Sequence, residues 1–147
     1  MDDVIAVIRD GQTYFFHKDQ QGSLTAVTDG TGNLVEKYRY DAYGATYVQS
    51  GSIYVPLSDM VKPFSTRLYT GREYDSETGL YHYRARTYSP SLGRFLQRDP
   101  VDTEDQVNLY AYVGNNPVNR TDPSGKFGLA GLVISVGIGA GLAYYDG

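Results

Sequence analysis

The segment GRFLQRDPVDTEDQVNLYAYVGNNPVNRTDPSG, residues 93–125, combines two Asp-Pro steps, at Asp99 and Asp122, with an aromatic run between them. That run, NLYAYV at residues 108–113, alternates in the manner of a β-strand. Asp122-Pro-Ser-Gly125 is a favourable turn sequence. We therefore expect a short strand between turns, which brings the two Asp-Pro steps together.

The residues that follow this segment have a different composition. From Phe127 to Tyr145 there are 19 residues without a charge, close to the roughly 20 needed to cross a bilayer as a helix. Gly137 and Gly141 have the GxxxG spacing that allows close helix packing in membranes. We divide the chain into residues 1–125, a β domain, and 126–147, an apolar, glycine-rich C-terminal segment that could form a helix. Membrane contact through 127–145, burial in protein, and the start of a truncated effector all remain open.

The composition indicates a mainly β protein. The 147 residues, enough for one domain, include 15 Tyr, 17 Gly and no Trp, which is typical of tyrosine-rich strands joined by glycine turns. A net charge of −4 does not favour a nucleic-acid partner. The sequence contains no cofactor motif and no Cys, and only His17 and His82 could supply imidazole, so we expect no cofactor and no metal. The acidic start predicts that any export signal lies elsewhere.

The sequence before residue 93 predicts a meander of short strands. Asp10-Gly11 predicts a tight hairpin within residues 4–16. The pattern Asp-x-x-Gly, which favours a type I turn, follows three times, at Asp19/Gly22, Asp29/Gly32 and Asp41/Gly44. Residues 45–66 lose the alternation, and we expect a loop with one short strand near residues 53–55.

A longer strand is expected at Leu80–Tyr88, after a turn at residues 76–79. Alternation would place Tyr81 and Tyr83 on one face and His82, Arg84, Arg86 and Tyr88 on the other. Six of the nine arginines lie between Arg67 and Arg98, so the second face would be cationic. This patch could neutralise the acidic residues downstream, or it could be an ordinary exposed face.

Three ordered motifs resemble the core domain of Rhs (rearrangement hot spot, YD-repeat) proteins: KYRYDAYG, TGREYDSETGLYHYRARTYSPSLGRFLQRDP and NLYAYVGNNPVNRTDPSG. The resemblance covers about residues 12–125. It implies a secreted or cell-surface protein in which antiparallel YD-repeat hairpins form part of a β-shell. The core domain would close one end of that shell, enclose a C-terminal toxin or effector, and cut its own chain beyond the DPxG motif.

Self-cleavage of the aspartyl type needs two carboxylates, one ionised to activate water and one protonated to assist the carbonyl or the leaving group. The resemblance makes Asp99 and Asp122 the candidate pair, and such a pair would titrate as a unit. Arg94 and Arg98 could hold one carboxylate ionised or bind the carbonyl. The candidate bond is Lys126-Phe127, although Lys126 stands where the family usually has leucine. Asp-Pro is also a common turn starter, so a purely structural role is the competing interpretation.

The chain has too few YD repeats to build a closed shell. We expect it to combine with the rest of an Rhs shell or with copies of itself, through unpaired strand edges. The alternative function is a non-catalytic assembly or adhesion protein whose tail anchors or packs. Tyrosine abundance also leaves sugar binding as a weaker possibility.

Overall fold

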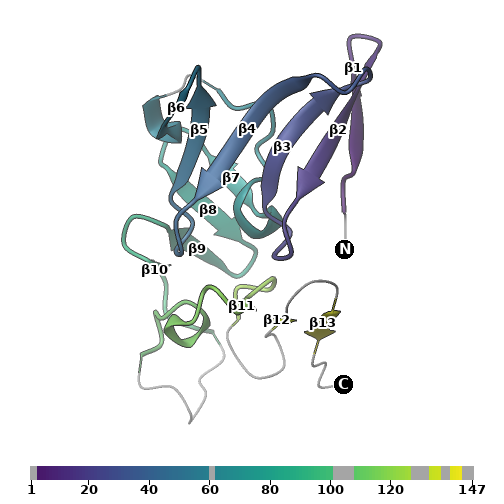
Figure 1. Ribbon diagram of the computed structural model, residues 1–147. Helices are drawn as coiled ribbons and strands as arrows, with labels where there is room; N and C mark the ends of the chain where they lie inside the picture. The colour runs from purple at the N-terminus through teal and green to yellow at the C-terminus, as the bar shows by residue number, and fades with distance from the viewer. Residues whose placement is uncertain (1–2, 60–61, 101–107, 127–132, 137–139, 144–147) are drawn as a thin grey trace.

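The computed structural model describes residues 3–59, 62–100, 108–126, 133–136 and 140–143. Figure 1 shows a six-stranded sheet across the top of the molecule, with the other strands below and behind it. All strand pairs are antiparallel, and the helical residues form only short 3₁₀ turns in the described part of the chain. The expected class, a mainly β protein built from antiparallel hairpins, is confirmed.

The first sheet is a meander in which each strand pairs with the next one in sequence. Its strands are β1 (Ala6–Arg9), β2 (Gln12–Lys18), β3 (Leu24–Asp29), β4 (Leu34–Tyr40), β5 (Thr46–Ser50) and β6 (Ile53–Pro56). The Asp10-Gly11 hairpin is confirmed, because both residues have positive φ between β1 and β2. The short strand expected near residues 53–55 is confirmed as β6. The loop expected before it is wrong, because β5 pairs with β6 in a hairpin that precedes the 3₁₀ turn η1 (Leu57–Asp59).

The three Asp-x-x-Gly turns are confirmed and share one hydrogen-bond pattern. At Asp29 the backbone carbonyl accepts a hydrogen bond from Gly32 N–H, and Oδ1 accepts from the backbone N–H groups of Thr31 and Asn33. Asp19 and Asp41 do the same for their own turns. Each turn is therefore fixed by its own aspartate, which explains why this part of the fold can be predicted locally.

The second sheet has the order β10-β9-β8-β7. Its strands are β7 (Glu73–Asp75), β8 (Leu80–Tyr83), β9 (Arg86–Ser89) and β10 (Arg94–Phe95), and the 3₁₀ turn η2 (Tyr69–Gly71) precedes them. The single strand expected at Leu80–Tyr88 is wrong. The chain reverses at Arg84-Ala85, where Arg84 has a φ of 60°. The reversal pairs Tyr81 with Tyr88 and Tyr83 with Arg86, so Arg86 is buried instead of joining an exposed cationic face.

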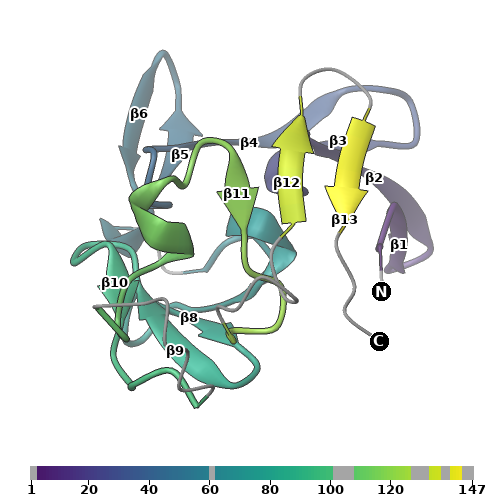
Figure 2. The ribbon, with the colours of Figure 1, turned by 90° about the horizontal axis from the view of Figure 1, so that it is seen from below.

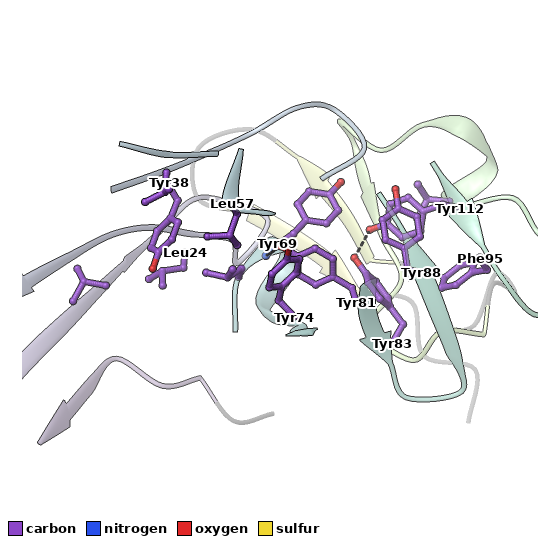
Figure 3. Close-up of a cluster of buried hydrophobic side chains, with 14 residues drawn as sticks. Leu24, Tyr38, Leu57, Tyr69, Tyr74, Tyr81, Tyr83, Tyr88, Phe95 and Tyr112 are labelled. Atoms are coloured by element: carbon purple, nitrogen blue, oxygen red, sulfur yellow. Dashed lines mark hydrogen bonds between the residues drawn. The ribbon is translucent and has the colours of Figure 1, made fainter. Parts of the chain in front are cut away.

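Tyrosine rings form the centre of the core. Figure 3 shows Tyr83, Tyr88 and Tyr112 next to Phe95, with Leu24 and Tyr38 farther toward the first sheet. The ring centroids of Tyr88 and Tyr112 are 4.6 Å apart. Burial raises the pKa of these phenols, and the hydroxyl groups find partners inside the core, as buried tyrosines require. The tyrosines whose side chains are fully buried are Tyr69, Tyr81, Tyr83, Tyr88 and Tyr112.

One hydroxyl links the two sheets and gives a first prediction. Tyr81 Oη lies 2.6 Å from Thr46 Oγ1 on β5 and accepts a hydrogen bond from the backbone N–H of Tyr69. Tyr81→Phe leaves these buried groups without that partner, so we expect the free energy of unfolding to fall by about 1 to 2 kcal/mol in urea titrations. The control is Tyr110→Phe, because Tyr110 is exposed; an equal loss there would contradict the argument.

Residues 108–113, expected to be a strand, are irregular. Only Ala111 makes a bridge, to Arg94, and the chain then enters the 3₁₀ turn η3 (Val113–Asn115). Ala111, Tyr112 and Val113 are all buried although they are consecutive. The segment is held by packing into the tyrosine core on several sides, so an alternating pattern does not apply to it.

The C-terminal segment is described at two places, and the expected helix is wrong there. Val133–Val136 forms β12 and Ala140–Ala143 forms β13, and β12 pairs with β11 (Arg120–Thr121) in a small three-stranded sheet, visible in Figure 2. Among the described residues no helix is long and apolar enough to span a bilayer. Glycine weakens an isolated helix, and β11 offers a strand edge to pair with.

Candidate active site

The second Asp-Pro step is a turn that packs on the β8–β9 hairpin. Ala85 N–H donates a hydrogen bond to the carbonyl of Ser124, and Gly125 lies directly against the backbone of Tyr83. A Cβ added at Gly125 would be 2.0 Å from the Tyr83 carbonyl oxygen, and the φ of Gly125 is +66°. Only glycine fits this approach, so the last residue of the DPSG motif is fixed by packing as well as by backbone conformation.

Arg86, the first residue of β9, organises the site. Its Nε donates to the carbonyl of Gly125 at 2.6 Å, its Nη1 donates to the carbonyl of Leu109 at 3.0 Å, and its guanidinium lies over the Phe95 ring at 3.6 Å. The side chain is 1% exposed. A single arginine therefore joins β9, the segment after the first Asp-Pro step and the DPSG turn.

The same guanidinium brings the two aspartates together. Nη2 of Arg86 is 3.3 Å from Oδ2 of Asp99 and 3.4 Å from Oδ2 of Asp122, and both carboxylates are fully buried. Asp99 reaches this position because its N–H donates to the Leu109 carbonyl. Two carboxylates that contact one nitrogen are close enough to influence each other's protonation, as an acid–base pair must be.

Burial raises the pKa of Asp122 above its ordinary value of 3.8. The hydrogen bond from Ser124 and the charge of Arg86 act in the opposite direction, and the charge of Asp99 raises the pKa further. Burial also lowers the pKa of Arg86. One guanidinium cannot neutralise two buried carboxylates, so proton uptake by one of them relieves the excess negative charge.

Asp122 begins a buried turn of the same Asp-x-x-Gly type as the exposed turn that begins at Asp29. As in the earlier Asp-x-x-Gly turns, its carbonyl accepts from the glycine N–H at the fourth position, and its Oδ1 accepts from the N–H of the residue after it, Lys126. At the surface, the hydrogen bond from Thr31 lowers the pKa of Asp29. The two turns thus share a geometry but shift the pKa in opposite directions, because only Asp122 is buried beside a second carboxylate.

These opposite shifts predict opposite pH dependences of stability. A carboxyl group whose pKa is raised by folding binds more protons in the folded state than in the unfolded state. The contribution of Asp122 to the free energy of unfolding therefore decreases as pH rises above 3.8. Asp29, with a lowered pKa, contributes stability above 3.8 that is lost as pH falls. Urea titrations from pH 3 to 7 should show that Asp122→Asn removes a decline with rising pH and that Asp29→Asn removes an increase. Parallel pH profiles for the two variants would contradict this.

Of the residues predicted from sequence, Asp99 and Asp122 are brought together. Arg94 and Arg98 are exposed, and their suggested roles stay predictions. Lys126 is exposed, whereas Phe127 lies outside the described residues. Sequence reasoning missed the role of Arg86, since it assigned this residue to a cationic face. The sequence carries no signal for this role, because the chain reverses at Arg84-Ala85 without a glycine or an asparagine.

The described residues contain no group of three His, Cys, Asp or Glu side chains that could hold a metal ion. The ring of His17 contacts Thr28 Oγ1 at 2.9 Å. Asp99 and Asp122 contact a guanidinium, which already occupies the position that a cation would take. Two buried carboxyl groups in this arrangement can support proton transfer to and from a nearby water or peptide group.

A meander of antiparallel hairpins with Asp-x-x-Gly turns is the architecture of a YD-repeat β-shell domain. The sequence pattern of the teneurin YD-shell family matches residues 1–118, and the chain belongs to this family. It is also similar to the tRNA nuclease WapA of Bacillus subtilis (strain 168), with 42% identity over 138 residues that cover 91% of this chain and 5% of that protein. The resemblance to Rhs proteins is thereby confirmed.

Toxin components contain the same domain. The toxin subunit YenC2 of Yersinia entomophaga is 40% identical over 97 residues, which cover 66% of this chain and 9% of that subunit. In the crystal structure of a TcdB2-TccC3-Cdc42 complex, the similar region has a TM-score of 0.66 and 34% identity, and covers 81% of this chain and 5% of that chain. The chain is thus a YD-shell domain of the kind found in toxin-type proteins, and it spans less than a tenth of these relatives.

Proposed function

We propose that this domain closes one end of a YD-repeat β-shell and cuts its own chain once, at Lys126-Phe127. The observation that supports cleavage is the contact of Asp99 and Asp122 with one nitrogen of Arg86, beside the turn that leads into this bond. Ser124 Oγ links the pair to the bond: it lies 3.1 Å from Asp122 Oδ1 and 3.4 Å from the carbonyl oxygen of Lys126.

In this proposal the two carboxyl groups divide the work of hydrolysis. Asp122, whose pKa is raised, is the acid, and Asp99 is the base that accepts a proton from water. The water oxygen bonds to the carbonyl carbon of Lys126, and the C–N bond to Phe127 breaks as Asp122 supplies a proton to the departing nitrogen. The products are a carboxylate on Lys126 and an amine on Phe127.

Intact mass of the purified protein tests this function. The wild type should lose residues 127–147, whereas Asp99→Asn and Asp122→Asn should keep the full 16.3 kDa. Asp29→Asn is the matched control, because it changes the same turn motif at the surface and should be cut as the wild type is. A wild type that stays intact under all conditions of pH between 4 and 8 would refute self-cleavage for this chain.

The partners proposed are the polypeptide that follows the cut and the rest of an Rhs shell, or further copies of this chain. The toxin names of the relatives support an enclosed effector and a place outside the producing cell, at its surface or secreted. Assembly is supported by Ile8 and Ile53, which are 77% and 63% exposed on the two outermost strands of the first sheet. A non-catalytic assembly or adhesion role is the alternative, and an intact wild type would favour it.

A further inference from the structure

A groove of about 1390 Å³ runs between the first sheet and the segment that leads into β7. Its wall includes β1, β2 and β8, and it borders the Arg86 cluster, because Thr121 and Pro123 on either side of Asp122 also line it. Phe16 and Phe64, whose rings pack edge to face, form an apolar part of that wall. Three acidic residues line the groove, against six of the chain's 13 lysines and arginines. The six basic residues are Arg9, Lys18, Lys62, Arg67, Arg72 and Arg84. We call it the basic groove.

The three carboxylates of the basic groove already have partners. Asp3 pairs with Lys18, and Glu73 lies 3.7 Å from Arg67. Glu36 accepts a hydrogen bond from the backbone N–H of Phe64 at 2.7 Å. The remaining positive charge is therefore local, in a protein whose net charge is −4.

Arg72 and Arg84 lie close enough in the groove for their charges to interact. Burial lowers the pKa of Arg72 and the positive charge of Arg84 lowers it further, while the charge of Asp122 acts in the opposite direction. The Nε of Arg72 is buried and has no hydrogen-bond partner among the described residues. Two guanidinium groups that repel each other, one with an unused donor, would gain from an anionic acceptor placed between them.

We propose that the basic groove binds an extended acidic polypeptide segment, with carboxylates on Arg72 and Arg84 and apolar side chains against Phe16 and Phe64. Mixed charge and an aromatic wall suit a peptide that alternates acidic and apolar residues. A nucleic acid fits less well, because it carries a phosphate at every nucleotide and some of these would face Glu36 and Glu73, whereas a peptide of alternating residues can place apolar side chains there. This proposal does not depend on self-cleavage.

Fluorescence anisotropy with a labelled peptide of alternating glutamate and valine tests the proposal, with a lysine-valine peptide and a single-stranded RNA as comparison probes. The glutamate peptide should bind tightest, and Arg72→Gln/Arg84→Gln should weaken binding by about tenfold or more. The control Arg39→Gln/Arg94→Gln removes two exposed cations outside the groove and should bind as the wild type does. Arg84→Gln alone serves if the double variant does not fold, and it should also weaken binding.

Three results would overturn the proposal. The first is no binding of the glutamate peptide at low ionic strength. The second is an equal loss in the groove variant and in the Arg39/Arg94 control, which would mean that only bulk charge matters. The third is tighter binding of the RNA than of the peptide, which would assign the groove to a different class of partner.

Discussion

Gly125→Ala should lower the free energy of unfolding by about 3 to 4 kcal/mol, one of the two largest effects expected for a single change in this domain. The added methyl group would lie 2.0 Å from the carbonyl oxygen of Tyr83 and 3.2 Å from the N of Arg86. Both are backbone atoms of the β8–β9 hairpin, so neither can move aside without disturbing the sheet. Urea denaturation of an uncut background, Asp122→Asn, measures the effect without interference from cleavage.

Gly51→Ala is the matched control for Gly125→Ala. Gly51 has nearly the same positive φ, 62°, but an added Cβ meets nothing within 4 Å. It should cost only the conformational strain of alanine, about 1 kcal/mol. Equal losses at the two positions would show that backbone conformation, and not the close approach to Tyr83, decides the effect.

Removing the guanidinium of Arg86 is expected to be equally severe. Arg86→Met leaves the carboxylates of Asp99 and Asp122 buried without their shared cation, a change of the kind that typically costs about 3 to 5 kcal/mol near neutral pH. The loss should shrink as pH falls, because protonation removes the unpaired charges. Chemical denaturation at pH 4 and pH 7 measures both the loss and its pH dependence.

The control for Arg86→Met is Arg94→Met, which removes an exposed arginine from the neighbouring strand β10. It should change the free energy of unfolding by less than about 0.5 kcal/mol.

A rescue experiment tests the electrostatic explanation. Adding Asp99→Asn and Asp122→Asn to Arg86→Met should restore part of the lost stability at pH 7, since neutral amides need no counter-charge. A loss that is the same at pH 4 and pH 7 would indicate that Arg86 matters through its hydrogen bonds to Gly125 and Leu109 alone.

The parts of the fold that could be predicted are those fixed by local chemistry. In each Asp-x-x-Gly turn the aspartate side chain accepts hydrogen bonds from backbone N–H groups no more than four residues away. The four-residue motif is therefore sufficient to predict the turn. Asp10-Gly11 is similar, because few other dipeptides accept positive φ at both positions. The pairing of Asp99 with Asp122 rested instead on the family resemblance and on a strand expected at residues 108–113, where the structure is irregular.

The errors in prediction arise where packing overrides local preference. Arg84 adopts a φ of 60° without being glycine or asparagine, so the β8–β9 turn has no sequence signature. One unrecognised reversal placed Arg86 on the wrong face and hid the central residue of the site. Residues 111–113 are likewise buried in succession by the tyrosine rings around them, which no alternating pattern reveals.

The pairing of β11 with β12 bears on what happens after a cut at Lys126-Phe127. β11 precedes that bond and β12 follows it, and the two strands are in register through Arg120 with Ile134 and Thr121 with Val133. Hydrolysis would therefore turn one polypeptide into a nicked, two-chain complex whose pieces remain joined by strand hydrogen bonds. Breaking the bond and freeing the fragment are then separate events with separate rates, because the first requires the folded site and the second requires the paired strands β11 and β12 to separate.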